Sequence, residues 1–161
     1  MTSQYGERCE RSYTQRIEAS PDQVFPLLCP VREAEWLDGW AYEMIHSDSG
    51  VAEEGCVFQT EWHDFPESVW MISRHDPNDR VVEFVRITPG IVATRLHIKL
   101  ESTPHNATSV HISYAHTPIS AAGAAFIEKH YSQSEFEQSM AWWEKSMNHF
   151  LATGEILREN G

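Results

Sequence analysis

Apolar and polar residues alternate through the middle of the chain, the pattern of β-strands that have one buried face. Turn sequences rich in Asp, Asn, Gly and Pro separate these segments, for example Asp76-Pro77-Asn78-Asp79. Because consecutive strands with short connections pair side by side, the pattern predicts an antiparallel meander. The predicted strands are Arg11–Ile17, Trp40–Ser47, Val57–Trp62, Val69–His75, Val81–Thr88, Val92–Thr103 and Thr108–His116, with a turn at Asp64-Phe65-Pro66.

Two short helices are predicted between the first two strands. Ser20 can cap the first helix, Pro21 suits its first helical position, and Gln23 stands where the partner of a capping box belongs. The second helix is the short amphipathic segment Val31–Trp36, which follows Pro30.

A long amphipathic helix is predicted near the end of the chain, after a segment of small residues at 118–131. Ser132 and Glu135 form one capping box for its start, and Ser134 offers an alternative start, so we expect the helix from about Ser134. Gly154 marks its end. Apolar residues repeat on one face at spacings of four and three, namely Phe136, Met140, Trp143, Met147 and Phe150 or Leu151.

Two short helices after a first strand, then a run of strands and a closing helix, resemble the SRPBCC superfamily. That superfamily holds the START domains, the birch-pollen-allergen-like proteins, polyketide cyclases and Hsp90-ATPase-activator homologues. The resemblance covers nearly the whole chain and implies one α+β domain, 1–161, with the helix-grip fold. In this fold a curved seven-stranded antiparallel sheet wraps around the long C-terminal helix, and a cavity between them holds an apolar small molecule.

Strand alternation indicates which side chains face that cavity. On Thr108–His116 the apolar face includes Val110 and Ile112, so Tyr114 and His116 are expected inside as polar groups. The predicted ligand-binding residues are Phe58, Thr60, Trp62, Trp70, Leu96, Ile98, Tyr114, His116, Phe136, Met140, Trp143 and Met147. Each apolar member is also explained as ordinary core, and Tyr114 with His116 is also explained as a hydrogen-bonded structural pair.

The facing of Val81–Thr88 depends on the turn that follows it. A two-residue turn at Pro89-Gly90 would direct Glu83 and its alternate neighbours inward, whereas a three-residue turn would direct Arg86 and Phe84 inward. We favour the second arrangement. His116, Tyr114 and Arg86 are then the candidate catalytic groups, since they could polarise a carbonyl in an apolar cavity. We expect His116 to be neutral and hydrogen-bonded to Tyr114, a backbone group or the ligand.

Acidic residues outnumber basic ones 24 to 12, giving a formal charge of −12. This charge disfavours nucleic acids and anionic membrane surfaces as partners. No apolar run has the length of a membrane span, so we expect no membrane insertion and no signal peptide. The three cysteines, Cys9, Cys29 and Cys56, are an odd set that suits a reducing cytoplasm.

No metal and no cofactor are expected. The nine histidines include His111 and His116 on one strand, but five residues apart they point to opposite faces. Glycine fingerprints for dinucleotides and zinc-site spacings are absent from the sequence.

The favoured function is binding of an apolar or aromatic small molecule, lipid-like or polyketide-like, by a carrier or sensor. The alternative is an enzyme of the polyketide cyclase/dehydratase kind that uses interior His, Tyr or Arg as acid–base groups. A third reading is a protein-interaction module like the Hsp90-ATPase-activator homologues. A homodimer is left open.

Overall fold

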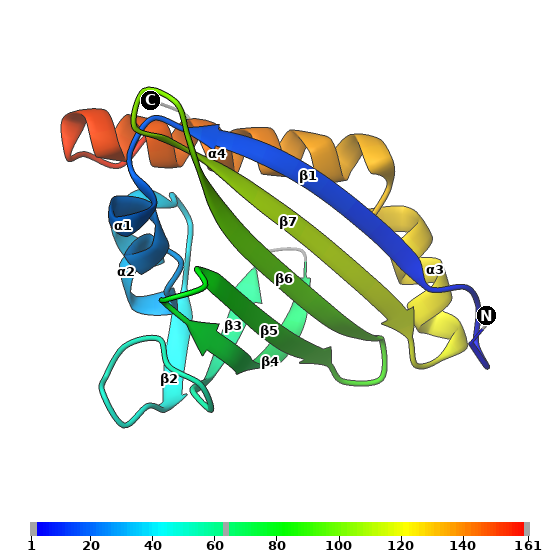
Figure 1. Cartoon of the computed structure of the whole chain (residues 1–161). Helices are drawn as coiled ribbons and strands as arrows, with labels where there is room; N and C mark the ends of the chain where they lie inside the picture. The colour runs from blue at the N-terminus through cyan, green and yellow to red at the C-terminus, as the bar shows by residue number, and fades with distance from the viewer. Residues whose placement is uncertain (1–2, 63–64, 160–161) are drawn as a thin grey trace.

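A curved antiparallel sheet grips one long helix in the computed structural model, which describes residues 3–62 and 65–159 and, of Trp62, only the backbone. The seven strands lie in the order β1-β7-β6-β5-β4-β3-β2. Figure 1 shows the sheet curving beneath α4, which follows β1 along one edge. The strands are β1 Cys9–Ile17, β2 Tyr42–His46, β3 Val57–Trp62, β4 Phe65–Asp76, β5 Val81–Thr88, β6 Val92–Thr103 and β7 Ala107–Pro118.

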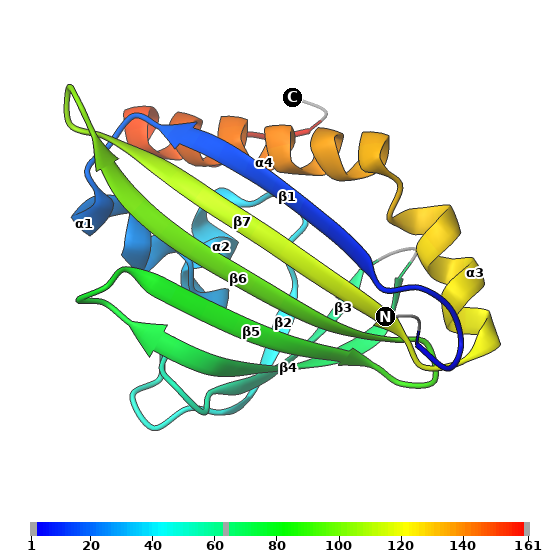
Figure 2. The same cartoon turned by 45° about the vertical axis from the view of Figure 1, so that its right-hand side comes forward.

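The helices lie at the two ends of the sheet and along its concave side. Figure 2 shows α1 and α2 at one end, α3 at the other, and α4 running between them. The helices are α1 Pro21–Val24, the 3-10 turn η1 Phe25–Leu27, α2 Pro30–Trp36, α3 Ala121–His130 and α4 Gln133–Thr153. The predicted fold class, with two short helices between the first two strands and a long final helix, is confirmed.

Several strand boundaries differ from the prediction. The bounds of β3, β5 and β6 match it, β1, β4 and β7 are longer, and β2 is shorter than Trp40–Ser47. The turn predicted at Asp64-Phe65-Pro66 is wrong for Phe65 and Pro66, which begin β4, whereas Asp64 lies outside the described residues. Phe65 pairs with β3 and packs its ring against Phe126 of α3, 5.8 Å between centroids, a tertiary contact that local turn chemistry does not show.

The ends of the helices follow the predicted capping chemistry. The Gln23 side chain accepts a hydrogen bond from the backbone N–H of Ser20, at 3.2 Å. At the start of α4, the hydroxyl of Ser132 accepts from the backbone N–H of Glu135, also at 3.2 Å, so the earlier of the two predicted starts is used. Gly154 ends α4 in the left-handed conformation, with φ of 76°.

Hydrogen bonds from α4 to the backbone of β1 fix the helix against the sheet edge. Glu144 accepts from the backbone N–H of Arg16 at 2.6 Å. One turn later, the amide of Asn148 accepts from the backbone N–H of Glu18 at 2.8 Å and donates to the carbonyl of Arg16 at 3.0 Å. Two side chains of α4 therefore take the place of a neighbouring strand.

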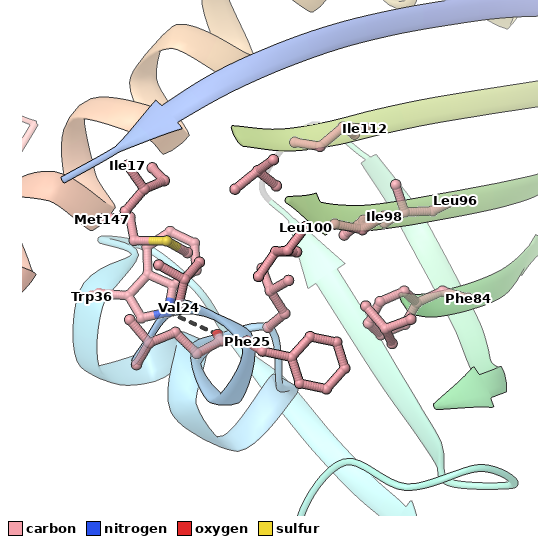
Figure 3. Packing of buried hydrophobic residues seen from close by; sticks show 14 of the residues in the cluster. Ile17, Val24, Phe25, Trp36, Phe84, Leu96, Ile98, Leu100, Ile112 and Met147 are labelled. Carbon is pink, nitrogen blue, oxygen red and sulfur yellow. Dashed lines mark hydrogen bonds between the residues drawn. The ribbon is translucent and has the colours of Figure 1, made fainter. Parts of the chain in front are cut away.

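The solid part of the core lies at the α1–α2 end (Figure 3). Trp36 is fully buried there, and its indole N–H donates to the carbonyl of Leu27 at 3.0 Å. Ile17, Val24 and Met147 pack around it and are likewise inaccessible to solvent. The interior fills at this end because the short helices close it, which leaves unfilled space toward α3.

Gly123 allows α3 to sit against the turn between β5 and β6. A Cβ at this position would lie 1.8 Å from the carbonyl oxygen of Ile91. That oxygen also accepts a hydrogen bond from the backbone N–H of Ile119 at 3.0 Å. The first turn of α3 is thus fixed to the sheet by a backbone contact that only glycine permits.

Candidate functional site

A pocket of about 680 Å³ lies between the concave face of the sheet and α4. Strands β3 to β7 form its floor, α4 covers it, and α2 and α3 close its two ends. Most of the predicted ligand-binding residues line it, namely Phe58, Thr60, Trp70, Leu96, Ile98, Tyr114, His116, Phe136, Met140 and Trp143.

Two predicted residues are not among the lining. The side chain of Trp62 lies outside the described part of the chain. The prediction for Met147 is wrong, because this side chain is fully buried in the solid core beside Trp36 (Figure 3). The apolar stripe of α4 continues past the pocket to the place where the helix meets α2, so its last members pack as core.

Aromatic rings form much of the wall. Phe58 stacks on Trp70 with centroids 5.5 Å apart and planes 11° from parallel, and the Trp70 N–H donates to the hydroxyl of Thr60 at 2.8 Å. At the α2 end, Trp36 stacks on Trp143 at 5.9 Å. The indole N–H of Trp143 is buried without a hydrogen-bond partner among the described residues.

The orientation of Arg86 follows from the three-residue turn at 89–91. Thr88 pairs with Val92, and the N–H of Ile91 donates to the carbonyl of Thr88 at 3.0 Å. This register directs Arg86 inward, as favoured from the sequence, opposite Thr94 of β6.

Arg86, Thr94 and His116 stand opposite one another on β5, β6 and β7 and form a polar row across the pocket floor. Nη2 of Arg86 donates to the hydroxyl of Tyr131 at 2.9 Å and to that of Thr94 at 3.3 Å. The guanidinium carbon lies 4.9 Å from the ring centre of Trp70. Within the described chain Arg86 has no carboxylate partner, and its Nε is buried without a hydrogen bond.

His116 is buried, with 2% of its surface exposed. Its Nδ1 forms a 2.8 Å hydrogen bond with the hydroxyl of Thr94, and its ring stacks on Tyr131. Burial, reinforced by the positive charge of Arg86, lowers the pKa of His116 to about 3. The neutral state agrees with the prediction, but the hydrogen-bonding partner is the cross-strand Thr94, while Tyr114 only stacks on the imidazole at 5.4 Å.

Glu33 of α2 also lines the pocket, and the sequence analysis missed it. Its carboxyl forms no hydrogen bond or ion pair with the described residues, and burial raises its pKa to about 8. The spacing of three residues between Glu33 and Trp36 would have placed both on the inner face of the helix. Tyr114 shares this environment: burial raises its pKa to about 12, opposed by the positive charge of Arg86 and assisted by Glu33.

Tyr131, the first of the two residues between α3 and α4, is the second group that sequence reasoning missed. It brings a hydroxyl and a ring face to the polar row. No strand or helix periodicity applies at a junction between two helices, so its direction had no sequence signal.

Two other expectations concern metals and membranes. Among residues 3–62 and 65–159, no three His, Cys, Asp or Glu side chains are grouped so that they could hold a metal ion. No helix in the same part of the chain is long and apolar enough to cross a membrane.

No protein-family model and no curated protein sequence matches the chain. Solved structures, in contrast, superpose on it. Norcoclaurine synthase from Thalictrum flavum superposes with a TM-score of 0.67 at 15% identity, over 91% of this chain and 87% of the synthase. The Zhui aromatase/cyclase from a Streptomyces species gives 0.66 at 10% identity, over 93% and 99% of the two chains. CalU16 from Micromonospora echinospora gives 0.58 at 16%, over 94% and 84%.

The chain has the helix-grip fold of these structures. The resemblance inferred from the order of helices and strands is therefore confirmed as a resemblance of fold. Because one fold serves many activities, the function has to be argued from the pocket itself.

Proposed function

We propose that the protein binds a largely aromatic or apolar small molecule in the helix-grip pocket. The observation that carries this proposal is the pocket of about 680 Å³, with aromatic walls and the polar row of Arg86, Thr94 and His116 on its floor. Small-molecule sites have volumes of roughly 300–1,000 Å³ and combine apolar walls with a few polar groups that orient the ligand.

One structural neighbour supports this proposal. Norcoclaurine synthase has been solved in complex with dopamine and hydroxybenzaldehyde, and that structure superposes on 90% of this chain with a TM-score of 0.67. A protein of this fold thus holds two small aromatic molecules.

Native mass spectrometry of freshly purified protein tests the proposal, combined with titration of the neutral dye N-phenyl-1-naphthylamine. We expect an apolar adduct in the mass spectrum, or, in the titration, dye fluorescence that rises on binding. The bound dye should also quench the fluorescence of Trp36, Trp70 or Trp143 at the pocket wall. Denatured protein is the control. A chain that carries no adduct and binds no apolar dye would contradict the proposal.

A second candidate function is acid–base catalysis on a carbonyl compound, as in a cyclase or dehydratase. It is favoured by the polar row: Arg86 and Tyr131 present donors to one region of the pocket, and neutral His116 lies beside them. The test is incubation of the protein with the compound identified by mass spectrometry. Conversion that disappears in His116→Phe, while binding persists, would support catalysis; binding without conversion would leave the protein a carrier.

A further inference from the structure

We propose that the ligand is dipolar, with an anionic oxygen group bound at Arg86 and a protonated amine bound at Glu33, joined by an aromatic body. This inference rests on the proposed function and specifies the class of ligand. It follows from a guanidinium and a carboxyl group that line one pocket and form no ion pair with each other or with any other described residue.

Arg86 is the positive end of the pocket. The hydroxyls of Tyr131 and Thr94 and the ring of Trp70 hold its guanidinium in place, but none of these carries a compensating negative charge. Nε is buried and unbonded, so one N–H of the fork lacks an acceptor. A carboxylate or phenolate bound at the guanidinium would supply the missing negative charge.

Glu33 is the acidic end of the pocket, and a bound ammonium group would favour its ionised form. It lies on α2, across the pocket floor from the polar row, and its carboxyl has no donor among the described residues. Along β7, Tyr114 stands between the Arg86 end and the Glu33 end of the pocket. His116 belongs to the row of Arg86, and Tyr114, two residues and about 7 Å further along the strand, is influenced electrostatically by both charges.

An amine fits the Glu33 end better than a neutral hydroxyl. Trp36 lies one helical turn after Glu33 and is stacked on Trp143, so aromatic surface borders the carboxyl. An ammonium group gains both from a carboxylate and from nearby indole faces. A hydroxyl would gain only a hydrogen bond.

Four probes with the same naphthalene body separate these contributions. Naphthalene has neither polar end, 2-naphthoate has the anion, 2-(aminomethyl)naphthalene has the amine, and 6-(aminomethyl)-2-naphthoate has both. Isothermal titration calorimetry at fixed pH and salt would measure their affinities. We expect the dipolar probe to bind about tenfold or more tightly than either singly charged probe.

Two substitutions assign each end to its residue. Glu33→Gln keeps the shape of the side chain and should reduce the affinity of the amine probes about tenfold while leaving 2-naphthoate unchanged. Arg86→Met should reduce the affinity of the carboxylate probes about tenfold while leaving 2-(aminomethyl)naphthalene unchanged. The matched controls are Glu35→Gln, on the exposed side of α2, and Arg95→Met, on the exposed face of β6.

The outcomes distinguish this inference from the proposed function. If naphthalene and the neutral dye bind but the charged ends add nothing, the dipolar ligand is wrong and the apolar pocket stands. If Glu33→Gln weakens 2-naphthoate as much as the amine, the assignment of the amine to Glu33 is wrong. If no naphthalene probe binds at all, the proposed function itself fails.

Discussion

The imidazole of His116 lies flat on the phenol ring of Tyr131, with centroids 3.9 Å apart and planes 4° from parallel. His116 lies on β7, the strand next to the edge strand β1, and Tyr131 directly follows the last residue of α3. The same phenol accepts a hydrogen bond from Arg86 at 2.9 Å. The junction between α3 and α4 is therefore fixed to the pocket floor by a ring stack and a hydrogen bond. Movement of either helix would displace the residues of the polar row.

Protonation of His116 should destabilise the protein in acid. Its pKa falls from 6.5 to about 3 on folding, so the unfolded chain takes up the proton more readily. The stability contributed by the neutral ring is complete above pH 6.5 and is lost as the pH falls toward 3, with a slope of up to about 1.4 kcal/mol per pH unit. Between pH 6.5 and 5, the free energy of unfolding of His116→Phe should therefore fall by about 1–2 kcal/mol less than that of the parent, measured by urea denaturation.

His111→Phe is the control for that experiment, because His111 lies on the outer face of the same strand. Between pH 6.5 and 5, this variant should lose as much stability as the parent. Equal profiles for all three proteins would show that His116 is protonated without penalty, and the direct check is the NMR titration of its ring.

Glu33→Gln should stabilise the protein, with the opposite dependence on pH. The pKa of Glu33 rises from 4.5 to about 8 on folding, so its contribution is complete below pH 4.5 and is lost as the pH rises toward 8. We expect the variant to gain about 1–3 kcal/mol at pH 7 and almost nothing near pH 4. Glu35→Gln, which removes a surface carboxylate of the same helix, should show no such trend. A destabilised Glu33→Gln would indicate an ion pair within the folded chain.

Two methionines of α4 test whether the pocket is a real space. Met140 lines it, whereas Met147 is packed in the solid core. Met140→Trp should leave the melting temperature nearly unchanged and abolish dye binding. Met147→Trp should overpack the core, cost roughly 1–3 kcal/mol, and leave the dye site intact in the folded fraction. Equal losses of stability would favour a filled interior at both positions.

Gly123→Ala should loosen α3 from the sheet. The new methyl group would collide with the backbone of Ile91, which cannot rotate away, so we expect a loss of about 2 kcal/mol or more and a shift of α3. Gly90→Ala is the comparison, since its site has open space and only a positive φ of 74° to oppose it, for about 1–2 kcal/mol. Hydrogen exchange of α3 amides should increase in Gly123→Ala alone.

Strand parity predicted the floor of the pocket because side chains alternate strictly along β6 and β7. Once Val110 and Ile112 faced inward, Tyr114 and His116 had to follow. Arg86 needed one further fact, the length of the turn after β5, for which the three-residue turn was favoured but a two-residue turn stayed open. The order of strands and helices was predictable because apolar residues repeat with a different period in each, and because turn residues or helix caps mark their ends.

The remaining site residues depend on how the helices dock. Glu33 faces the pocket because α2 packs with its Trp36 side inward, and Tyr131 does so because α3 and α4 meet at an angle there. Met147 was misplaced for the same reason, since the point where α4 stops bordering empty space depends on α2. Local sequence carries little information about such contacts between distant segments.

The side chains of Glu144 and Asn148 have a consequence for self-association. By hydrogen bonding the backbone of Arg16 and Glu18, they occupy groups at the outer edge of β1 that an incoming strand from another molecule would use. β2 is the other end strand of the sheet. A strand from another molecule would have to displace these bonds at this end of β1, so we expect strand addition to favour β2, where charged or proline substitutions should suppress it.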